Sequence, residues 1–321
     1  MIICYFTPMK LKFVFPVGVL LLLAGFGMAL LFQSNSETEV MKNRAELMRH
    51  YKVFPVPLPA EMELAGEKVP LNDPEVRERL DRELLINTYW QSNTLLMIKR
   101  TKRAFEVMEP ILAAYKVPDD FKYLAVIESS LTNAVSGSGA AGYWQFLKAT
   151  GQSYGLEVND DVDERYHLEK STAAACKYLL HAKDVLGSWA MAAAAYNRGI
   201  QGVMNARNSQ EETDYYQLWL NSETSRYNFR IIAMKLIIEN PHHYGFHVKP
   251  HDFYKTIETY KVKVDSTITS LPRWAKDRHS NYKMLKELNP WLMGYELKME
   301  KGKTYELLVP SLQTQGSESE H

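Results

Sequence analysis

A single glutamate, Glu128, stands at the end of an apolar stretch whose spacing predicts a helix. Phe121, Leu124 and Ala125 come seven, four and three residues before it, so all four residues share one helical face. A carboxylate on an apolar face is costly to ionise, and its pKa should therefore rise. A carboxylic acid that stays protonated near neutral pH can donate a proton to a glycosidic oxygen. The sequence thus indicates general acid catalysis by Glu128.

Polar motifs follow Glu128 and could complete a binding site around it. A loop of small residues, 133–141, contains Ser136 and Ser138, although small residues also occur wherever a loop simply has to turn. Two further motifs follow along the chain: Gly142-Tyr143-Trp144-Gln145 and Ala195-Tyr196-Asn197. The Gln145 amide can hydrogen-bond a substrate or pack against its own loop.

A last motif lies further on, in Glu223-Thr-Ser-Arg226-Tyr227. Glu223 and Tyr227 are four residues apart, so they lie on roughly the same side of a helix. Arg226 is predicted to form a surface pair with Glu223, or to contact carboxylates of a ligand.

The elements that would position these residues are helices. Almost no segment between Glu75 and Asn240 alternates with a period of two, which predicts an all-α domain. Capping and breaking residues, such as Pro74, Gly187 and Pro241, bound several of the helices. The helices are predicted at 75–90, 93–115, from Pro118 through Glu128, 142–154, 171–186, 189–196, 214–221 and 225–239.

The pattern changes after Phe253. Residues 259–264 alternate as a strand does, two short helical stretches follow at 271–277 and 282–288, and residues 304–310 form a closing strand. The predicted fold class is therefore mainly α, with an α-helical domain followed by a small α+β (β-α-α-β) C-terminal module.

The N-terminus predicts a membrane segment. Lys10 and Lys12 precede an uncharged apolar run, Phe13–Phe32, that is long enough to cross a bilayer as a helix. Its end lacks a small-x-small cleavage site, which favours an uncleaved anchor over a cleaved signal. The flanking lysines would hold the N-terminus in the cytoplasm and the rest of the chain outside.

The expected organisation therefore has five parts. The two cysteines, Cys4 and Cys176, would lie on opposite sides of the membrane, so no disulfide is expected. The parts are 1–32 (cytoplasmic stub and anchor), 33–71 (a proline-punctuated tether), 72–250 (the helical domain), 251–312 (the module) and 313–321 (a polar tail predicted to be disordered).

Composition excludes some function classes. Lys+Arg and Asp+Glu balance at 38 each, so the chain offers no basic field to hold a nucleic acid. No Cys/His spacing matches a zinc site, and His242, His243 and His247 are predicted to be surface residues. We expect no metal and no organic cofactor.

Residues 119–237 resemble the catalytic domain of lytic transglycosylases of the soluble-lytic-transglycosylase type, with the membrane-bound murein transglycosylase D group as the nearest. The resemblance rests on Glu128-Ser129, Ala134-Val135-Ser136 and the three later motifs, in this order and spacing. It implies a lysozyme-like fold. The C-terminal module resembles a LysM peptidoglycan-binding module through its β-α-α-β pattern and Leu288-Asn289-Pro290. Asp265-Ser-Thr-Ile replaces the usual Gly-Asp-Thr-Leu turn, which leaves glycan binding by the module open.

The resemblance implies a reaction on peptidoglycan glycan strands. The family cleaves the bond between N-acetylmuramic acid and N-acetylglucosamine without adding water, and it forms a 1,6-anhydro ring. Glu128 matches the glutamate that acts first as acid and then as base, with the sugar's N-acetyl group assisting. A second catalytic carboxylate is not expected, because the acids Asp160, Asp161, Asp163 and Glu164 are predicted to form a solvated loop with helix caps.

The resemblance also assigns residues to the cleft. Ser136 and Ser138 would help to hold the N-acetyl group and the glutamate, and Tyr227 would orient the carboxyl group. The other matching positions are Gln145, Tyr196 and Asn197 as cleft residues, Trp144 as cleft wall or core, and Glu223 as structural or in contact with the peptide stem.

Two rival functions remain open. A goose-type-lysozyme-like hydrolase would need an acid that activates water, and a catalytically inactive wall-binding scaffold would not need Glu128, Gln145, Asn197 and Tyr227. On the favoured interpretation the chain is anchored in the inner membrane of a bacterial envelope and faces the periplasm. The sequence names no protein partner.

Overall fold

The computed structural model describes residues 38, 41–42, 44 and 53–311. The chain divides into two units, Met1–Pro55 and Val56–His321, and the second holds the elements that position the candidate site. The expected anchor at 13–32 and the tail at 313–321 lie outside the described residues. Among the helices that are described, none combines the length and the apolar character needed to cross a membrane.

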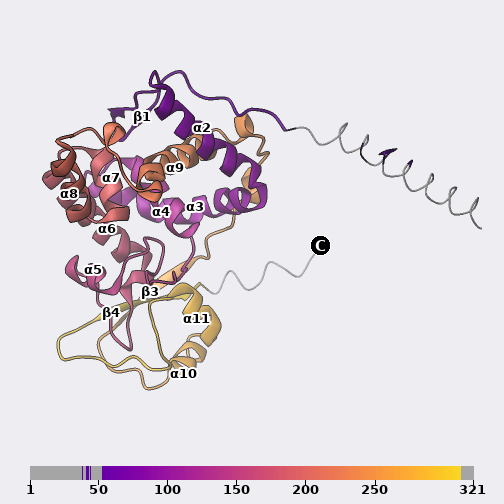
Figure 1. The fold of residues 1–321 in the computed structure, drawn as a ribbon. Coiled ribbons are helices and arrows are strands. Elements are labelled where there is room, and N and C mark those ends of the chain that lie inside the picture. The colour runs from indigo at the N-terminus through magenta and orange to yellow at the C-terminus, as the bar shows by residue number, and fades with distance from the viewer. Residues whose placement is uncertain (1–37, 39–40, 43, 45–52, 312–321) are drawn as a thin grey trace, which may run out of the picture. The chain divides into compact units, whose positions relative to one another are not determined.

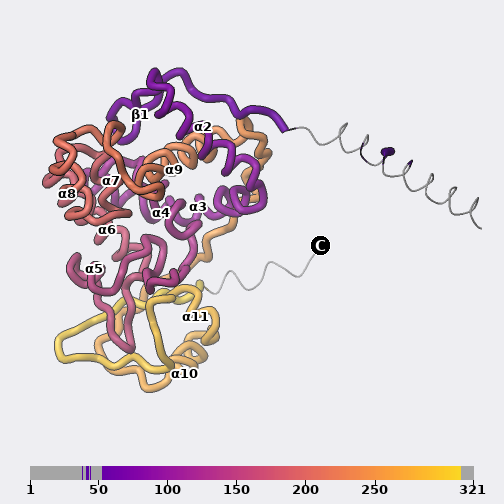
Figure 2. Tube along the Cα trace, in the orientation of Figure 1, coloured from indigo at the N-terminus to yellow at the C-terminus, as the bar shows by residue number. Residues whose placement is uncertain are grey.

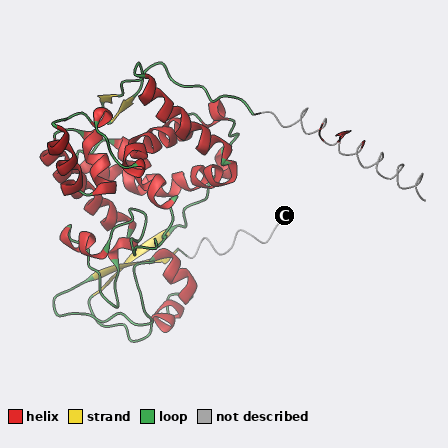
Figure 3. Cartoon of the chain, viewed as in Figure 1, coloured by secondary structure: helices red, strands yellow, loops and turns green. Residues whose placement is uncertain are grey.

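The larger part of the second unit is helical (Figures 1 and 3). Its helix α4 packs against α3 and α9, and α7 packs against α6, α8 and α9. The helices are α2 (Pro74–Tyr89), α3 (Gln91–Ala114), α4 (Lys122–Ser129), α5 (Lys148–Ser153), α6 (Leu168–Leu186), α7 (Trp189–Arg198), α8 (Ile200–Gln210) and α9 (Ser222–Glu239), with short 3-10 turns η1 (Asp119–Phe121), η2 (Glu164–Tyr166), η3 (Tyr215–Gln217), η4 (Pro241–Tyr244) and η5 (Pro250–Asp252).

Helix α7 lies at the centre because its side chains are small. Alanines at 190 and 192–195 are buried, and their methyl groups let three neighbouring helices approach closely. Alanine also costs the least of any residue to hold in a helix. Ser188 begins α7 by accepting a hydrogen bond from the Met191 amide, and Gly199 ends it with a φ of 79°. A closely packed helix of this kind gives the residues at its end, Tyr196 and Asn197, a fixed position.

The stretch predicted as a tether is folded in its second half. Residues 63–64 (β1) and 67–68 (β2) form a short antiparallel hairpin. Val56, Leu64, Val69 and Leu71 are buried in the core of the helical domain. The proline-punctuated segment therefore contributes apolar side chains to the domain from residue 56 onward.

Two predicted helices were wrong, and one helix was missed. The helix predicted at 142–154 begins only at Lys148, because Gly142 and Gln145 have positive φ angles of 79° and 48°, which interrupt a helix. The helix predicted at 214–221 is reduced to the turn η3. Helix α8 was not predicted at all; Val203 is its one buried residue, so its sequence has almost no apolar periodicity.

The C-terminal module has the predicted β-α-α-β order: β3 (Thr259–Val264), α10 (Leu271–Lys276), α11 (Tyr282–Leu288) and β4 (Tyr305–Pro310). Strands β3 and β4 pair antiparallel, with Thr259 opposite Pro310 and Val264 opposite Tyr305. Leu271, Leu292 and Leu307 lie at the centre of its core. The fold class expected from the sequence, mainly helical with a small α+β module, is confirmed.

The module packs on the segment that follows α5, and Figures 1 and 2 show the two side by side. Val162 from this segment is 1% exposed and belongs to the module's own core cluster. It pairs with Leu292 in an isolated β-bridge. The Asp163 amide donates to the Trp291 carbonyl at 2.8 Å, and the Met293 amide donates to the Asp161 carbonyl at 2.9 Å. The helical domain thus contributes both backbone and side chain to the module.

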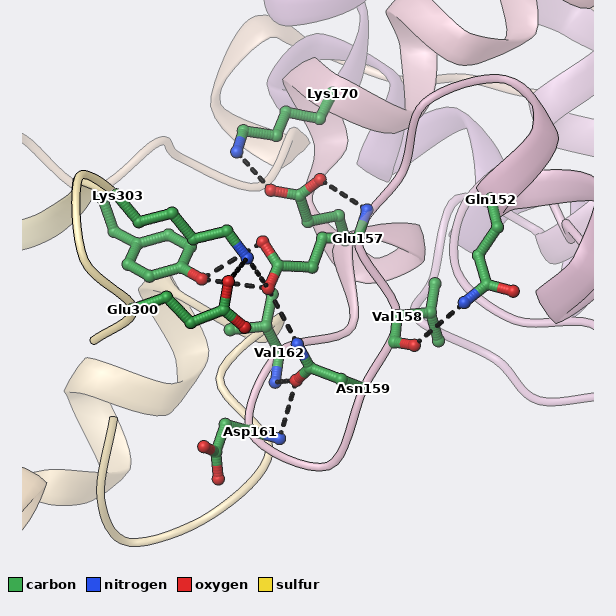
Figure 4. A network of polar contacts seen from close by, with 11 residues as sticks. Gln152, Glu157, Val158, Asn159, Asp161, Val162, Lys170, Glu300 and Lys303 are labelled. Atoms are coloured by element: carbon green, nitrogen blue, oxygen red, sulfur yellow. Dashed lines mark hydrogen bonds and ion pairs between the residues drawn. The ribbon is translucent and has the colours of Figure 1, made fainter. Parts of the chain in front are cut away.

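Charged groups reinforce this contact (Figure 4). The Lys303 ammonium lies 2.8 Å from Glu157, and the Tyr305 hydroxyl donates to the same carboxylate at 3.0 Å. The prediction of a solvated acidic loop was wrong for two of its members. Asp163 and Glu164 are 5% and 4% exposed, and they pair with Arg165 and Lys170 because a buried carboxylate needs a compensating charge.

Candidate active site

Glu128 lies in the last turn of α4, which ends where Ser130 adopts a left-handed conformation with φ 53°. Phe121, Leu124 and Ala125 are fully buried, and Glu128 is half-buried on the same helix. Burial raises the pKa of the Glu128 carboxyl group above its usual value, as the apolar face predicts. The group is therefore biased toward its protonated form.

Helix α9 directs two side chains at the end of α4. Tyr227 is buried, and its hydroxyl donates a hydrogen bond to Oε1 of Glu128. Burial, with Glu128 nearby, raises the pKa of Tyr227 well above its usual value, so the phenol remains a hydrogen-bond donor. Arg230, three residues further along, donates to the Ile127 carbonyl at 2.9 Å. Both groups favour the ionised carboxylate and so partly oppose the effect of burial on the Glu128 pKa.

Tyr196 supports the loop that follows Glu128. Its hydroxyl donates to the Trp144 carbonyl at 2.8 Å, and its ring centroid lies 5.8 Å from that of Phe146 and 5.1 Å from that of Tyr178. Burial raises the Tyr196 pKa first, and the charge of Glu128 adds to the shift, so the two groups are electrostatic neighbours. The structure therefore brings Tyr196 close to the candidate carboxyl group.

Asn197 connects the end of α7 to the start of α9. Its Nδ2 donates to Glu223 at 3.0 Å, and its Oδ1 accepts from the Thr224 hydroxyl at 2.8 Å. Glu223 is exposed, and its charge raises the Glu128 pKa. Glu223 is thus close enough to affect Glu128 electrostatically, and its own carboxylate is exposed to solvent.

The small-residue loop is held by its own polar groups. The Ser136 and Ser138 hydroxyls lie 3.0 Å apart, and Ser136 accepts from the Ala140 amide at 3.0 Å. The Gln145 side-chain nitrogen donates to the carbonyls of Ala134 and Gly142, at 2.9 and 2.8 Å. The sequence left two roles open for the Gln145 amide, binding substrate or packing against its own loop, and in the structure it forms hydrogen bonds within its own loop.

Two expectations need correction. Trp144 is completely buried, and its indole nitrogen donates to the Thr172 hydroxyl at 2.9 Å, so it is a core residue rather than a cleft wall. Arg226 does not pair with Glu223. Its guanidinium binds Glu83 in a bidentate fashion, because Glu83 is 1% exposed and needs a buried partner.

Some residues near the site were not found from the sequence. Arg230 lies one helical turn after Tyr227, and that spacing could have identified it. No sequence pattern pointed to Thr224 or Tyr178 as site residues, because each forms its hydrogen bond with a residue of another helix. Within residues 53–311 and the few described before them, no group of His, Cys, Asp and Glu side chains is arranged to hold a metal ion.

Comparison with known families agrees with this architecture. Residues 109–219 match the model of the transglycosylase SLT domain, and residues 260–313 match that of the soluble lytic transglycosylase C-terminal LysM-like domain. Residues 109–219 are therefore similar to an SLT transglycosylase domain and residues 260–313 to a LysM-like domain, in agreement with the resemblance drawn from the sequence motifs.

Two curated relatives are the membrane-bound lytic murein transglycosylases D of Escherichia coli strains K12 and O6:H1. Each is 31% identical to this chain over 193 residues, which is 57% of the chain and 41% of the relative. The match thus spans about two fifths of the length of these relatives.

Proposed function

We propose that the chain is a peptidoglycan lytic transglycosylase and that Glu128 is its catalytic residue. The observation that carries the proposal is the half-buried Glu128 carboxyl group, whose pKa is raised and whose Oε1 accepts a hydrogen bond from Tyr227, within an SLT domain. The substrate would be the β-1,4 bond between N-acetylmuramic acid and N-acetylglucosamine.

In the first step, protonated Glu128 would give its proton to the glycosidic oxygen while the bond to the anomeric carbon breaks. The sugar's own N-acetyl group would stabilise the positive charge that develops there. In the second step, the C6 hydroxyl oxygen would attack the anomeric carbon, and the Glu128 carboxylate would take the hydroxyl proton. The bond formed closes a 1,6-anhydro ring, and the carboxyl group returns to its protonated state.

The environment of Glu128 suits both steps. Burial raises the Glu128 pKa and favours the neutral acid needed in the first step, whereas the hydroxyl of Tyr227 and the charge of Arg230 favour the carboxylate needed in the second. Among the acids that follow Glu128, Glu157 is bound to Lys303 and Tyr305 of the module, and Glu164 to Lys170. These contacts argue against Glu157 or Glu164 as the second carboxyl group that a two-carboxylate hydrolase would need.

The remaining candidate residues take supporting roles in the proposal. Ser136 and Ser138 offer hydroxyls to the N-acetyl group, and the Asn197–Glu223 pair presents polar atoms to the glycan. Tyr196 and Gln145 hold the loop that carries them. We further propose that glycan strands in the bacterial periplasm are the partner and that residues 13–32 anchor the chain in the inner membrane. Both curated relatives are described as membrane-bound, which supports this location.

The test is mass spectrometry of fragments released from purified sacculi by residues 33–321 and by the Glu128→Gln variant. Fragments that end in anhydro-muramic acid, lighter by one water than hydrolysis products and absent with the variant, are expected. Reducing-end fragments would make the protein a hydrolase instead. Equal binding to sacculi with no release by either form would make it a scaffold.

A further inference from the structure

A cavity of about 700 Å³ lies between the helical domain and the LysM-like module. Its walls include Arg100 and Arg103 of α3, the segment 131–133 and Tyr143 on one side, and Trp291 of the module on the other. The volume is in the range of sites that hold small-molecule ligands. Because both domains line the cavity, it exists only where the module is docked.

The cavity adjoins the candidate active site through the chain itself. Segment 131–133 begins two residues after the end of α4, the helix that carries Glu128. Nη1 of Arg100 donates to the carbonyl of Ser130 at 3.0 Å, so the cavity wall is attached to the end of that helix. A polymer that is bound at Glu128 and extends along residues 129–133 would reach this wall of the cavity.

The cavity wall holds three carboxylates and three cations, but they are not evenly paired. Its acidic residues all have cationic partners: Lys261 lies 3.6 Å from Glu169 and 3.3 Å from Glu306, and Lys283 lies 3.7 Å from Glu287.

By contrast, Arg100 and Arg103 form no ion pair with any carboxylate in the part of the chain that the structure describes. Both guanidinium charges act on the phenol of Tyr143, where they oppose the increase in pKa that burial causes. Both arginines are thus close to one wall residue, and in the described part of the chain neither is paired with a carboxylate of the wall.

A guanidinium group that lacks a carboxylate partner matches the planar, bidentate geometry of a carboxylate better than it matches a neutral sugar. We propose that this cavity binds the carboxylate-bearing peptide stem of the peptidoglycan strand, with Arg103 and Arg100 as partners of the carboxylate. The proposal rests on the proposed function, because a strand positioned at Glu128 is what brings a stem peptide to this place. The same chemistry would accept a free peptide with a terminal carboxylate.

The decisive variant is Arg103→Gln, because Arg103 is exposed and makes no hydrogen bond within the described residues, whereas Arg100 also supports the end of α4. Lys102→Gln is the matched control: it removes the same charge from the neighbouring exposed position, which does not line the cavity. Each protein is assayed on peptide-bearing glycan strands and on strands from which an amidase has removed the peptides.

For Arg103→Gln we expect kcat/KM to fall about 10- to 100-fold more on peptide-bearing strands than on peptide-free strands, mainly through KM, since a hydrogen bond to a charged group is lost. Lys102→Gln should show no such difference between the substrates. Equal losses of Arg103→Gln on both substrates, or no loss on either, would overturn the proposal.

Titration calorimetry tests peptide binding in the cavity independently of whether the protein cleaves glycan strands. The Glu128→Gln protein is titrated with a free stem tripeptide and with a disaccharide that carries the same peptide. Binding that Arg103→Gln weakens would support the cavity site even if no strand were cut. Tighter binding of the disaccharide than of the tripeptide would identify the attached stem as the ligand, and the reverse order would identify free peptide. No binding of either ligand would overturn the proposal.

Discussion

The hydroxyl of Tyr227 donates a hydrogen bond to the carboxyl group of Glu128, although the two residues are 99 positions apart in the chain. The bond joins the C-terminal turn of α4 to the second turn of α9. It favours the ionised carboxylate, whereas burial, the largest effect on this group, favours the neutral acid. The hydrogen bond from Tyr227 and burial thus act on the Glu128 pKa in opposite directions, and mutation of Tyr227 can separate their effects.

Replacing Tyr227 with Phe removes the contribution that lowers the Glu128 pKa, so the pKa should rise further. An enzyme that needs Glu128 protonated loses activity as pH rises through that pKa, so the alkaline limb of the pH–rate profile should move to higher pH. We also expect kcat to fall about 10- to 100-fold, because a hydrogen bond to a charged group is lost. A lower kcat with an unmoved alkaline limb would contradict the assignment of this contact.

Replacing Glu128 with Gln should stabilise the protein at neutral and alkaline pH. A pKa that is raised in the folded state means that the folded protein binds more protons than the unfolded chain between the two pKa values. Glu128 therefore lowers stability as pH rises through that window, and Gln, which can still accept from Tyr227, does not. Thermal unfolding should show a higher Tm for Glu128→Gln at pH 8 and little difference at pH 4. Glu61→Gln, at an exposed position, is the control.

Removing the partner of buried Glu83 should be costly. In Arg226→Met the Glu83 carboxylate, 1% exposed, would lose both of its guanidinium hydrogen bonds. We expect the free energy of unfolding to fall by about 3–5 kcal/mol, measured by urea denaturation. Lys283→Met breaks an exposed pair with Glu287 and should cost about 0.5 kcal/mol or less. Similar losses for the two variants would refute the buried pair.

Glycine is required at position 142. A Cβ added there would lie 1.9 Å from the Arg165 carbonyl oxygen, and φ is +79°. We expect Gly142→Ala to lower the free energy of unfolding by about 3 kcal/mol or more, since backbone must move. The loop of Gln145 would move with it, and activity on sacculi should fall. Gly139→Ala has the same sign of φ with open space around the Cβ, and should cost about 1–2 kcal/mol of unfolding free energy. A tolerated Gly142→Ala would count against this packing.

His167 should make stability depend on pH in the acid range. Its ring stacks on Trp291, and burial, with the charges of Lys170 and Lys261, lowers its pKa to about 4. The unfolded chain binds a proton at this residue near pH 6.5, so stability is lost as pH falls from about 6.5 to 4. In His167→Gln this part of the dependence, at most about 3 kcal/mol, should disappear from unfolding measurements made across that range. An unchanged pH dependence would exclude the burial of a neutral imidazole.

The sequence predicts well where apolar periodicity is strong. Helix α11 begins and ends at the predicted residues, and α6 and α9 differ by three residues at their starts. Helix α8 was not predicted because a helix with a single buried residue shows no apolar periodicity. The turn at 142–147 was not predicted because Gln145 is not a residue that usually adopts positive φ. Such angles are imposed by tertiary packing, which local sequence does not report.

In the candidate site, too, some features follow from the local sequence and others depend on tertiary packing. The pKa shift of Glu128 follows from its apolar helical face, which is local information. The partners of Arg226 and of Asn197 do not follow, because each contact joins two helices whose approach is decided by the core. The sequence identifies which polar residues are present, and the packing of the helices decides which of their side chains form hydrogen bonds or ion pairs with one another.

Val162 belongs to the helical domain in sequence, but its side chain lies in the core of the module, so the two domains are not separate packing units. A chain cut at the predicted boundary between residues 250 and 251 leaves the module without a side chain that fills its core and without the backbone bridge to Leu292. We therefore expect the module to be less stable when it is separated from residues 157–163. Its evolutionary unit includes the 157–163 segment of its neighbour, and we expect the two sequences to drift together, with changes in the volume at 162 compensated in the module.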